Sequence, residues 1–188
     1  MLYNRGILLG GQNVTMPEKR KEKVFVYIVM GRYLFFLCWL ILFKLADSID
    51  KIPSMRGINL IPFHYDQIQI AGSRFHFNEV LYNAIIFIPA GFYFSALGKK
   101  KYISGIVLSA LLSLSFETLQ WIFALGASDI TDLITNTIGG AIGAGIFFVA
   151  GKMFKGREVK IISILGAVLE ILLVGMLLIA ATIKVDDF

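Results

Sequence analysis

Residues 102–124 read YISGIVLSALLSLSFETLQWIFA, a run in which Glu117 is the single charged side chain. A helix needs roughly 20 predominantly apolar residues to cross a hydrocarbon core about 30 Å thick, so this run is long enough to span a membrane. Four further runs of similar length and character lie at 24–43, 80–97, 130–151 and 161–183. The sequence therefore predicts an all-α polytopic membrane protein with five transmembrane helices.

The composition of the 188-residue chain agrees with this prediction. Hydrophobic residues make up 57% of it and charged residues 16%, whereas soluble domains average roughly 45–50% and about 25%. Such a balance excludes a disordered chain, a nucleic-acid-binding domain and a typical soluble enzyme. The single cysteine, Cys38, excludes an internal disulfide framework and a cysteine-based zinc site. His64 and His76 lie in a loop and are a poor metal-ligand pattern, so we expect no metal and no cofactor.

The basic residues behind the formal charge of +5 are spread unevenly between the connectors of the predicted spans. Basic residues cluster before the first span, between the second and third, and between the fourth and fifth: Lys19, Arg20, Lys21, Lys23; Lys99, Lys100, Lys101; Lys152, Lys155, Arg157, Lys160. The turn at 126–129 has no Lys or Arg. Because Lys and Arg concentrate in cytoplasmic loops, we predict that the N-terminus lies inside and the C-terminus outside. The clusters then contact anionic lipid head groups rather than nucleic acid.

This topology divides the chain into three parts. Residues 1–23 form a basic cytoplasmic tail that we expect to be partly disordered, 24–183 form one transmembrane domain, and 184–188 form a short outer tail. The long connector at 44–79 lies outside and contains the apolar segment 58–63. The alternation that follows, around a turn at 71–73, fits a weak hairpin, and an interfacial or re-entrant segment fits it equally well.

Polar side chains within spans two to four gather in the outer half of the membrane. They are Asn83, Glu117, Gln120, Asp129, Asp132 and Asn136. A polar or ionisable residue inside a span costs a few kcal/mol, so each needs a partner or a role. Spans three and four are joined by a very short turn and must be antiparallel neighbours. We therefore expect their polar faces to meet.

Two kinds of explanation stay open for these residues: helix capping at the membrane surface, and a role inside the membrane. Asp129 and Asp132 suit the start of a helix, where carboxylates complement the dipole and the free N–H groups. Capping does not explain Glu117, Gln120 or Asn136, which lie deeper and form either a structural hydrogen-bond network or a binding or catalytic site. Glu117 fits a general acid or base, a proton-linked transport site or a structural donor.

Other residues have a packing interpretation. Arg32 and Glu170 lie at equal predicted depth with opposite charge, so we expect them to pair between the first and last spans. Gly139, Gly140 and Gly143 give the small-residue spacing that lets helices approach closely. The same glycines offer a surface for a homo-oligomer.

Several ordered blocks resemble a known family. They are NLIPF at 59–63, Asn83 followed by FIPAGF at 87–92, SFETLQ at 115–120 and DITDLITNTIGG at 129–140. Together they resemble the VanZ-like family of integral membrane proteins associated with teicoplanin resistance, over roughly residues 25–155. One departure is the stretch 126–128, which reads GAS where many members carry an arginine.

The resemblance implies a multi-pass protein of the bacterial cytoplasmic membrane with a role in the cell envelope and in glycopeptide tolerance. It implies no settled biochemical activity. Glycopeptides act outside, on lipid-anchored wall precursors, which agrees with the outer position of the polar residues.

We therefore expect an outward-facing cavity that binds a membrane lipid, a lipid-linked wall precursor or a glycopeptide. The six polar residues above line it, with Asn59, Pro62 and Phe63 at its mouth. An intramembrane enzyme with Glu117 or Asp132 as acid or base, and a small transporter, are the alternatives.

Overall fold

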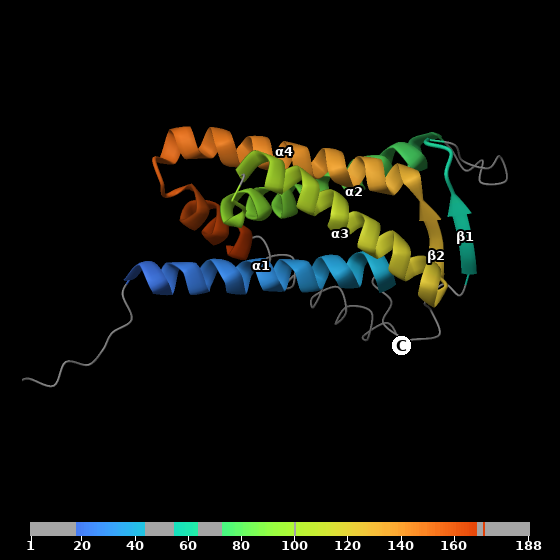
Figure 1. Cartoon of the computed structure of the whole chain (residues 1–188), viewed down its shortest axis with the longest axis horizontal. Helices are drawn as coiled ribbons and strands as arrows, with labels where there is room; N and C mark the ends of the chain where they lie inside the picture. The colour runs from blue at the N-terminus through green and yellow to red at the C-terminus, as the bar shows by residue number, and fades with distance from the viewer. Residues whose placement is uncertain (1–17, 44–54, 64–72, 100, 169–170, 172–188) are drawn as a thin grey trace, which may run out of the picture.

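A computed structural model of the chain describes residues 18–43, 55–63, 73–99, 101–168 and 171. The elements are α1 (Glu18–Phe43), β1 (Met55–Asn59), α2 (Ser73–Leu97), α3 (Lys101–Phe123), β2 (Leu125–Asp129) and α4 (Ile130–Phe154). A fifth helical segment begins at residue 158 and is described through 168. The long helices run lengthwise along the molecule, and the two strands lie across one end of them (Figure 1).

Four helices are long and apolar enough to cross a membrane: Lys23–Phe43, Asn78–Leu97, Lys101–Phe123 and Ile130–Phe154. They correspond to the first four predicted spans. α1 begins earlier than predicted because residues 18–23 are Glu, Lys and Arg, which are good helix formers and extend the helix beyond its apolar part. The fifth predicted span starts in the segment at 158–168. Apart from residue 171, its remainder lies outside the described residues, as do Glu170, His64, 1–17 and 184–188.

The outer connector differs from the predicted hairpin. Residues 75 and 77 belong to α2, so the predicted second strand is helical. The connector instead contributes β1, which pairs in parallel with β2 from Met55 opposite Leu125 to Asn59 opposite Asp129. Parallel strands need a long crossover, and here α2 and α3 supply it. The hairpin prediction was wrong because its second half is part of α2. The interfacial or re-entrant alternative stays a prediction, and residues 64–72 lie outside the described residues.

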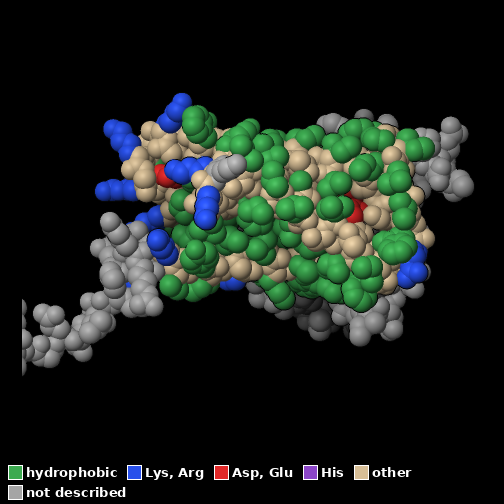
Figure 2. Space-filling model, viewed as in Figure 1, with side chains coloured by type: hydrophobic (Ala, Val, Ile, Leu, Met, Phe, Trp, Pro, Cys, Tyr) green, Lys and Arg blue, Asp and Glu red, His purple; other side chains and the backbone are tan. Residues whose placement is uncertain are grey.

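Figure 2 shows hydrophobic side chains along the length of the molecule and most of the visible Lys and Arg at one end. That end holds Leu97, Lys101 and Phe154. We call it the inner end, following the predicted orientation. The opposite end, which holds β1, β2 and Ile130, is the outer end.

Glycines let α2 and α4 pack with their backbones in contact. A Cβ added at Gly139 would meet the carbonyl of Ala84, and one at Gly143 would meet the carbonyl of Ile88. By contrast, a Cβ at Gly145 would meet nothing within 4 Å. Close approach of this kind is what small residues permit between membrane helices.

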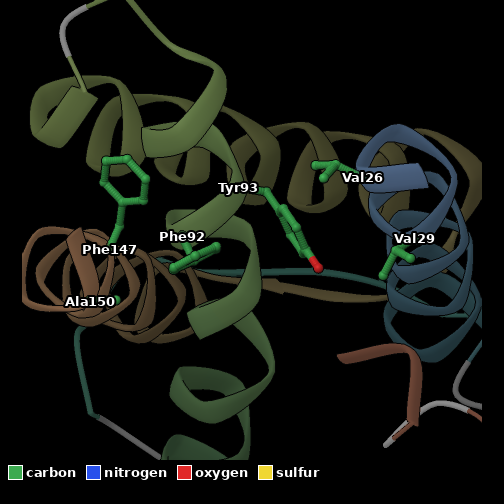
Figure 3. Close-up of a cluster of buried hydrophobic side chains, with 6 residues drawn as sticks. All are labelled: Val26, Val29, Phe92, Tyr93, Phe147 and Ala150. Carbon is green, nitrogen blue, oxygen red and sulfur yellow. The ribbon is translucent and has the colours of Figure 1, made fainter. Parts of the chain in front are cut away.

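Two apolar clusters hold the bundle together. The inner one joins α1, α2 and α4 through Val26, Val29, Phe92, Tyr93, Phe147 and Ala150; Figure 3 shows Tyr93 between Phe92 and the valines of α1. The outer one is made of Leu37, Leu42, Phe87, Ala90 and Phe116. Phe116 precedes Glu117 in α3, so the outer cluster adjoins the polar residues of the outer end.

Candidate functional site

The register of the two strands places Asn59 opposite Asp129. The Asn59 amide donates from Nδ2 to Asp129 Oδ2 at 3.0 Å, and the other carboxylate oxygen accepts from the Thr131 N–H at 2.7 Å. Asp129 is thus the N-cap of α4, in agreement with the capping prediction. One carboxylate ties β1 to the first turn of the fourth helix.

The segment that follows β1, residues 60–63, is a turn fixed at both ends. The Ile61 N–H donates to Asn59 Oδ1 at 3.2 Å, and the Phe63 N–H donates to Thr131 Oγ1 at 3.0 Å. Phe63 has a φ of 56°, in the left-handed region that a non-glycine residue seldom adopts. The 60–63 turn therefore holds a defined position against the start of α4.

Glu117 and Gln120 are buried on α3 and face different partners. Glu117 Oε2 accepts from the Asp129 backbone N–H at 2.8 Å, which joins α3 to β2. Gln120 Nε2 donates to the carbonyl of Ile41 at 3.2 Å, which joins α3 to α1. The two residues share one helix, and each connects it to another element.

Asn83, Asp132 and Asn136 connect the remaining helices. Asn83 Nδ2 donates to Asp132 Oδ1 at 2.7 Å, between α2 and α4. Asn136, one turn deeper and 3% exposed, donates from Nδ2 to Ser113 Oγ of α3 at 2.9 Å. The polar faces of the third and fourth spans thus meet in the structure.

We call these seven residues the outer polar cluster: Asn59, Asn83, Glu117, Gln120, Asp129, Asp132 and Asn136. Its members come from five elements and lie towards one end of the bundle. Pro62 and Phe63 lie instead on the exposed surface of the 60–63 turn. The predicted partner of Arg32, Glu170, lies outside the described residues, so that pair stays a prediction.

Two acceptors of this cluster have no hydrogen-bond partner in the described part of the chain. They are Gln120 Oε1 and Asn136 Oδ1, both buried. Leaving a buried polar group unsatisfied costs about 1–3 kcal/mol. Either oxygen suits an N–H or O–H donor.

Two hollows on the surface of the described residues are not lined by the cluster, so the open cavity that the sequence suggested there stays a prediction. One, of about 380 Å³, is lined on α3 by Leu111, Leu114, Ser115, Thr118 and Leu119; the other, of about 470 Å³, lies mainly along α4 towards the inner end. Asn59 and Glu117 bond to Asp129, and Asn83 bonds to Asp132, whereas Gln120 and Asn136 bond to Ile41 and Ser113.

Sequence reasoning missed Arg56 of β1. Its guanidinium donates from Nε to the carbonyl of Trp121 and from Nη2 to that of Ile122, both at 3.0 Å, and lies 5.5 Å from the centre of the Trp121 ring. A cation at the last carbonyls of a helix stabilises its C-terminus. No local pattern points to this role, because the acceptors are backbone atoms more than sixty positions away.

Within the ranges that the structure describes, no group of three His, Cys, Asp or Glu side chains is arranged to hold a metal ion. The acids of the cluster accept hydrogen bonds from amide nitrogens instead.

The sequence pattern of the VanZ/LLP1 family matches residues 30–151, from α1 into α4. The chain belongs to the VanZ family. It is 36% identical over 149 residues to Protein VanZ of Enterococcus faecium, which covers 77% of this chain and 88% of that relative. No solved structure matches the chain.

The matched region of this VanZ-family protein contains every member of the outer polar cluster, the 60–63 turn and Arg56. The basic segment at the start of α1 and the helix after residue 158 lie outside it. The family match therefore includes both strands and the whole outer polar cluster.

Proposed function

We propose that this VanZ-family protein is a component of the bacterial cell envelope that binds a membrane lipid or a lipid-linked wall precursor at its outer end. Through that binding it contributes to tolerance of the glycopeptide teicoplanin. The family supports the link to teicoplanin, and the outer polar cluster supports the binding.

The observation that carries the proposal is the pair of unpartnered buried oxygens, Gln120 Oε1 and Asn136 Oδ1. They lie within about a turn of Glu117 and Asp132 along their respective helices. A ligand with N–H or O–H groups would satisfy them and remove the cost of leaving them unpaired. Head groups of lipids and of sugar- or peptide-bearing precursors carry such donors.

The surface of α3 offers a place for the apolar part of such a ligand. The hollow of about 380 Å³ has three leucines, and its hydroxyls at Ser115 and Thr118 donate to the carbonyls of Leu111 and Leu114 at 2.7 Å each. These internal bonds leave a surface suited to an acyl chain. Glu117 lies about 9 Å below the end of α3, at ~1.5 Å per residue, a depth that suits the upper part of a chain.

The proposed position of the binding site also fits the place where glycopeptide drugs act. Glycopeptides act outside the membrane on lipid-anchored wall precursors. A protein that binds such a precursor, or a lipid beside it, in the outer half of the membrane alters the access of the drug to its target. Asp132 accepts a hydrogen bond from the side-chain amide of Asn83. A carboxylate held by an amide donor in this way favours a binding site over acid–base catalysis.

Native mass spectrometry in a gentle detergent tests the proposal. Wild type is compared with Glu117→Ala and Asn136→Ala, and with Thr137→Ala as the matched control, because the Thr137 hydroxyl already donates to Leu133 within α4. We expect copurified lipid on wild type and on the control, and its loss from the other two. Equal lipid occupancy in all four proteins contradicts the proposal.

The same variants are then returned to a deletion strain. Teicoplanin tolerance should be restored by wild type and by Thr137→Ala, and not by Glu117→Ala. A lipid or precursor product that appears only with wild type would instead favour the intramembrane enzyme.

A further inference from the structure

The 60–63 turn presents a group of large apolar side chains to its surroundings. Leu60 is 72% exposed, Ile61 59% and Phe63 56%, and Ile58 of the preceding strand is 59% exposed. Single exposed apolar residues are common, but a contiguous group marks a surface that meets a partner or a membrane.

The turn is not a loosely attached loop. The ladder between β1 and β2, the Asn59–Asp129 bond and the Phe63–Thr131 bond fix it to the start of α4. The exposed side chains are therefore held at a set height along the bundle.

That height can be estimated from α4. Its 25 residues span about 37 Å at ~1.5 Å per residue, which exceeds a hydrocarbon core of about 30 Å but not the 40–45 Å that includes the head-group regions. Each end of α4 therefore reaches a few ångströms into the interface. Thr131, which holds the turn, is the second residue of α4 and lies at that level.

The side chains of Trp121 and Arg56 indicate the same height for the turn. Trp121 near the end of α3 is 44% exposed, and Arg56 stacks on its ring. Tryptophan is enriched where membrane meets water, with its ring at the level of the head groups. Arg56 lies four positions before Leu60, in the strand that leads into the turn.

We propose that the 60–63 turn is an in-plane anchor that inserts Leu60, Ile61 and Phe63 into the outer leaflet of the lipid bilayer. Large apolar side chains of α2 and α4, such as Tyr82, Ile85 and Ile138, are exposed as well. The strands remain in the interface, where water can satisfy the outer edge of β1, so the requirement for paired backbone groups in hydrocarbon is not violated. The anchor is independent of any bound ligand.

Site-directed spin labelling tests the anchor. Nitroxides are placed one at a time at Leu60→Cys, Ile61→Cys and Phe63→Cys in a Cys38→Ala background, in vesicles of phosphatidylglycerol and phosphatidylethanolamine. Access to oxygen, which partitions into lipid, is compared with access to a water-soluble nickel chelate. Leu111→Cys on the exposed face of α3 is the lipid reference, and Lys99→Cys at the inner turn is the water reference.

We expect the labels in the turn to favour oxygen over nickel, on the side of Leu111→Cys. Nickel access like that of Lys99→Cys overturns the proposal and shows that the turn faces water or a soluble partner. Leu60 and Ile61 have little contact with the protein, so labels there should preserve the fold, which circular dichroism checks.

A measurement without a label on cysteine guards against misfolded variants. Phe63→Trp is made in a chain with Trp39→Phe and Trp121→Phe, and its fluorescence is recorded in vesicles with brominated lipids. Quenching by bromines near the head groups supports the anchor, and fluorescence unaffected by bromines at any depth contradicts it.

Discussion

At the scale of single residues, the side chains of Asn59 and Asp129 together join the outer connector to the bundle. Each uses both of its side-chain polar atoms: Asn59 donates to Asp129 and accepts from Ile61, while Asp129 accepts from Asn59 and from Thr131. Because one residue serves two partners, a substitution can remove one bond and keep the other. The contributions of capping and of strand attachment can thus be separated.

Substitutions at Asp129 should form a graded series. Asp129→Asn keeps an oxygen for the Thr131 N–H but turns an amide nitrogen towards the donor of Asn59. Asp129→Ala removes both acceptors and should cost about 0.5–2 kcal/mol from the cap alone. In thermal unfolding in micelles we expect wild type, Asn and Ala in falling order of stability. Faster hydrogen exchange of residues 60–63 in Asp129→Asn would identify the lost strand contact, and an unchanged exchange rate there would contradict it.

The Asn83–Asp132 bond between α2 and α4 calls for a double-mutant cycle. Asn83→Ala, Asp132→Ala and the double variant are compared by equilibrium unfolding in mixed micelles. Hydrogen bonds between membrane helices average about 0.6 kcal/mol, with values up to about 1.7. We expect a coupling energy towards the upper value, because the acceptor is a carboxylate. Additive single effects would mean that the bond contributes nothing.

The sequence located the polar residues within the helices more readily than it predicted their contacts. Span length and charge alternation alone placed Glu117, Gln120 and Asn136 towards one end of the bundle. Their partners include backbone groups, the Asp129 N–H and the Ile41 carbonyl, which have no sequence signature. The residues that share a helix face in sequence terms therefore turned out to join different elements.

At the scale of elements, the contact between α2 and α4 depends on backbone approach. Gly139 and Gly143 face carbonyls of α2, whereas Gly145 on the same helix faces open space. The glycine spacing predicted close packing but not the helix against which α4 packs. Local sequence also could not reveal β1, since its partner follows two intervening helices.

Two single-methyl substitutions test the contact. Gly143→Ala places a carbon on the Ile88 carbonyl and should destabilise the protein by about 1–3 kcal/mol, as overpacking does. Gly145→Ala adds the same methyl group where nothing stands in its way and should leave stability unchanged or slightly raised. The melting temperatures in detergent report both effects. Equal shifts in the two variants would argue against the α2–α4 contact.

At the scale of the whole molecule, charge and apolar surface are arranged along one axis. Figure 2 places most of the visible Lys and Arg at the inner end and hydrophobic side chains along the sides. The predicted clusters of Lys and Arg at the turns agree with this arrangement, and the orientation of the protein in the membrane stays a prediction. The sequence predicted the positions of the Lys and Arg clusters because the charges along a chain can be assigned without knowing how its helices pack.

Cysteine accessibility in intact cells tests the orientation. In a Cys38→Ala background, a membrane-impermeant maleimide should modify Ala127→Cys of β2 without disrupting the cells. It should modify Lys99→Cys only after permeabilisation. Both positions are exposed, so access depends on the side of the membrane. Labelling of Lys99→Cys in intact cells would reverse the predicted topology.

The pairing of β1 with β2 also constrains the order of biosynthesis. Asn59 and Asp129 are 70 positions apart, which at 5–20 residues per second of translation is a delay on the order of 4–14 s. During that interval β1 has left the ribosome without the strand it will join. The α2–α3 helical pair is synthesised before β2 and must be in place before β2 can pair with β1. A chain arrested before β2 has α1, α2 and α3 but lacks α4 and with it Asp132 and Asn136, so quality control of this protein can act on β1 while it has no partner strand.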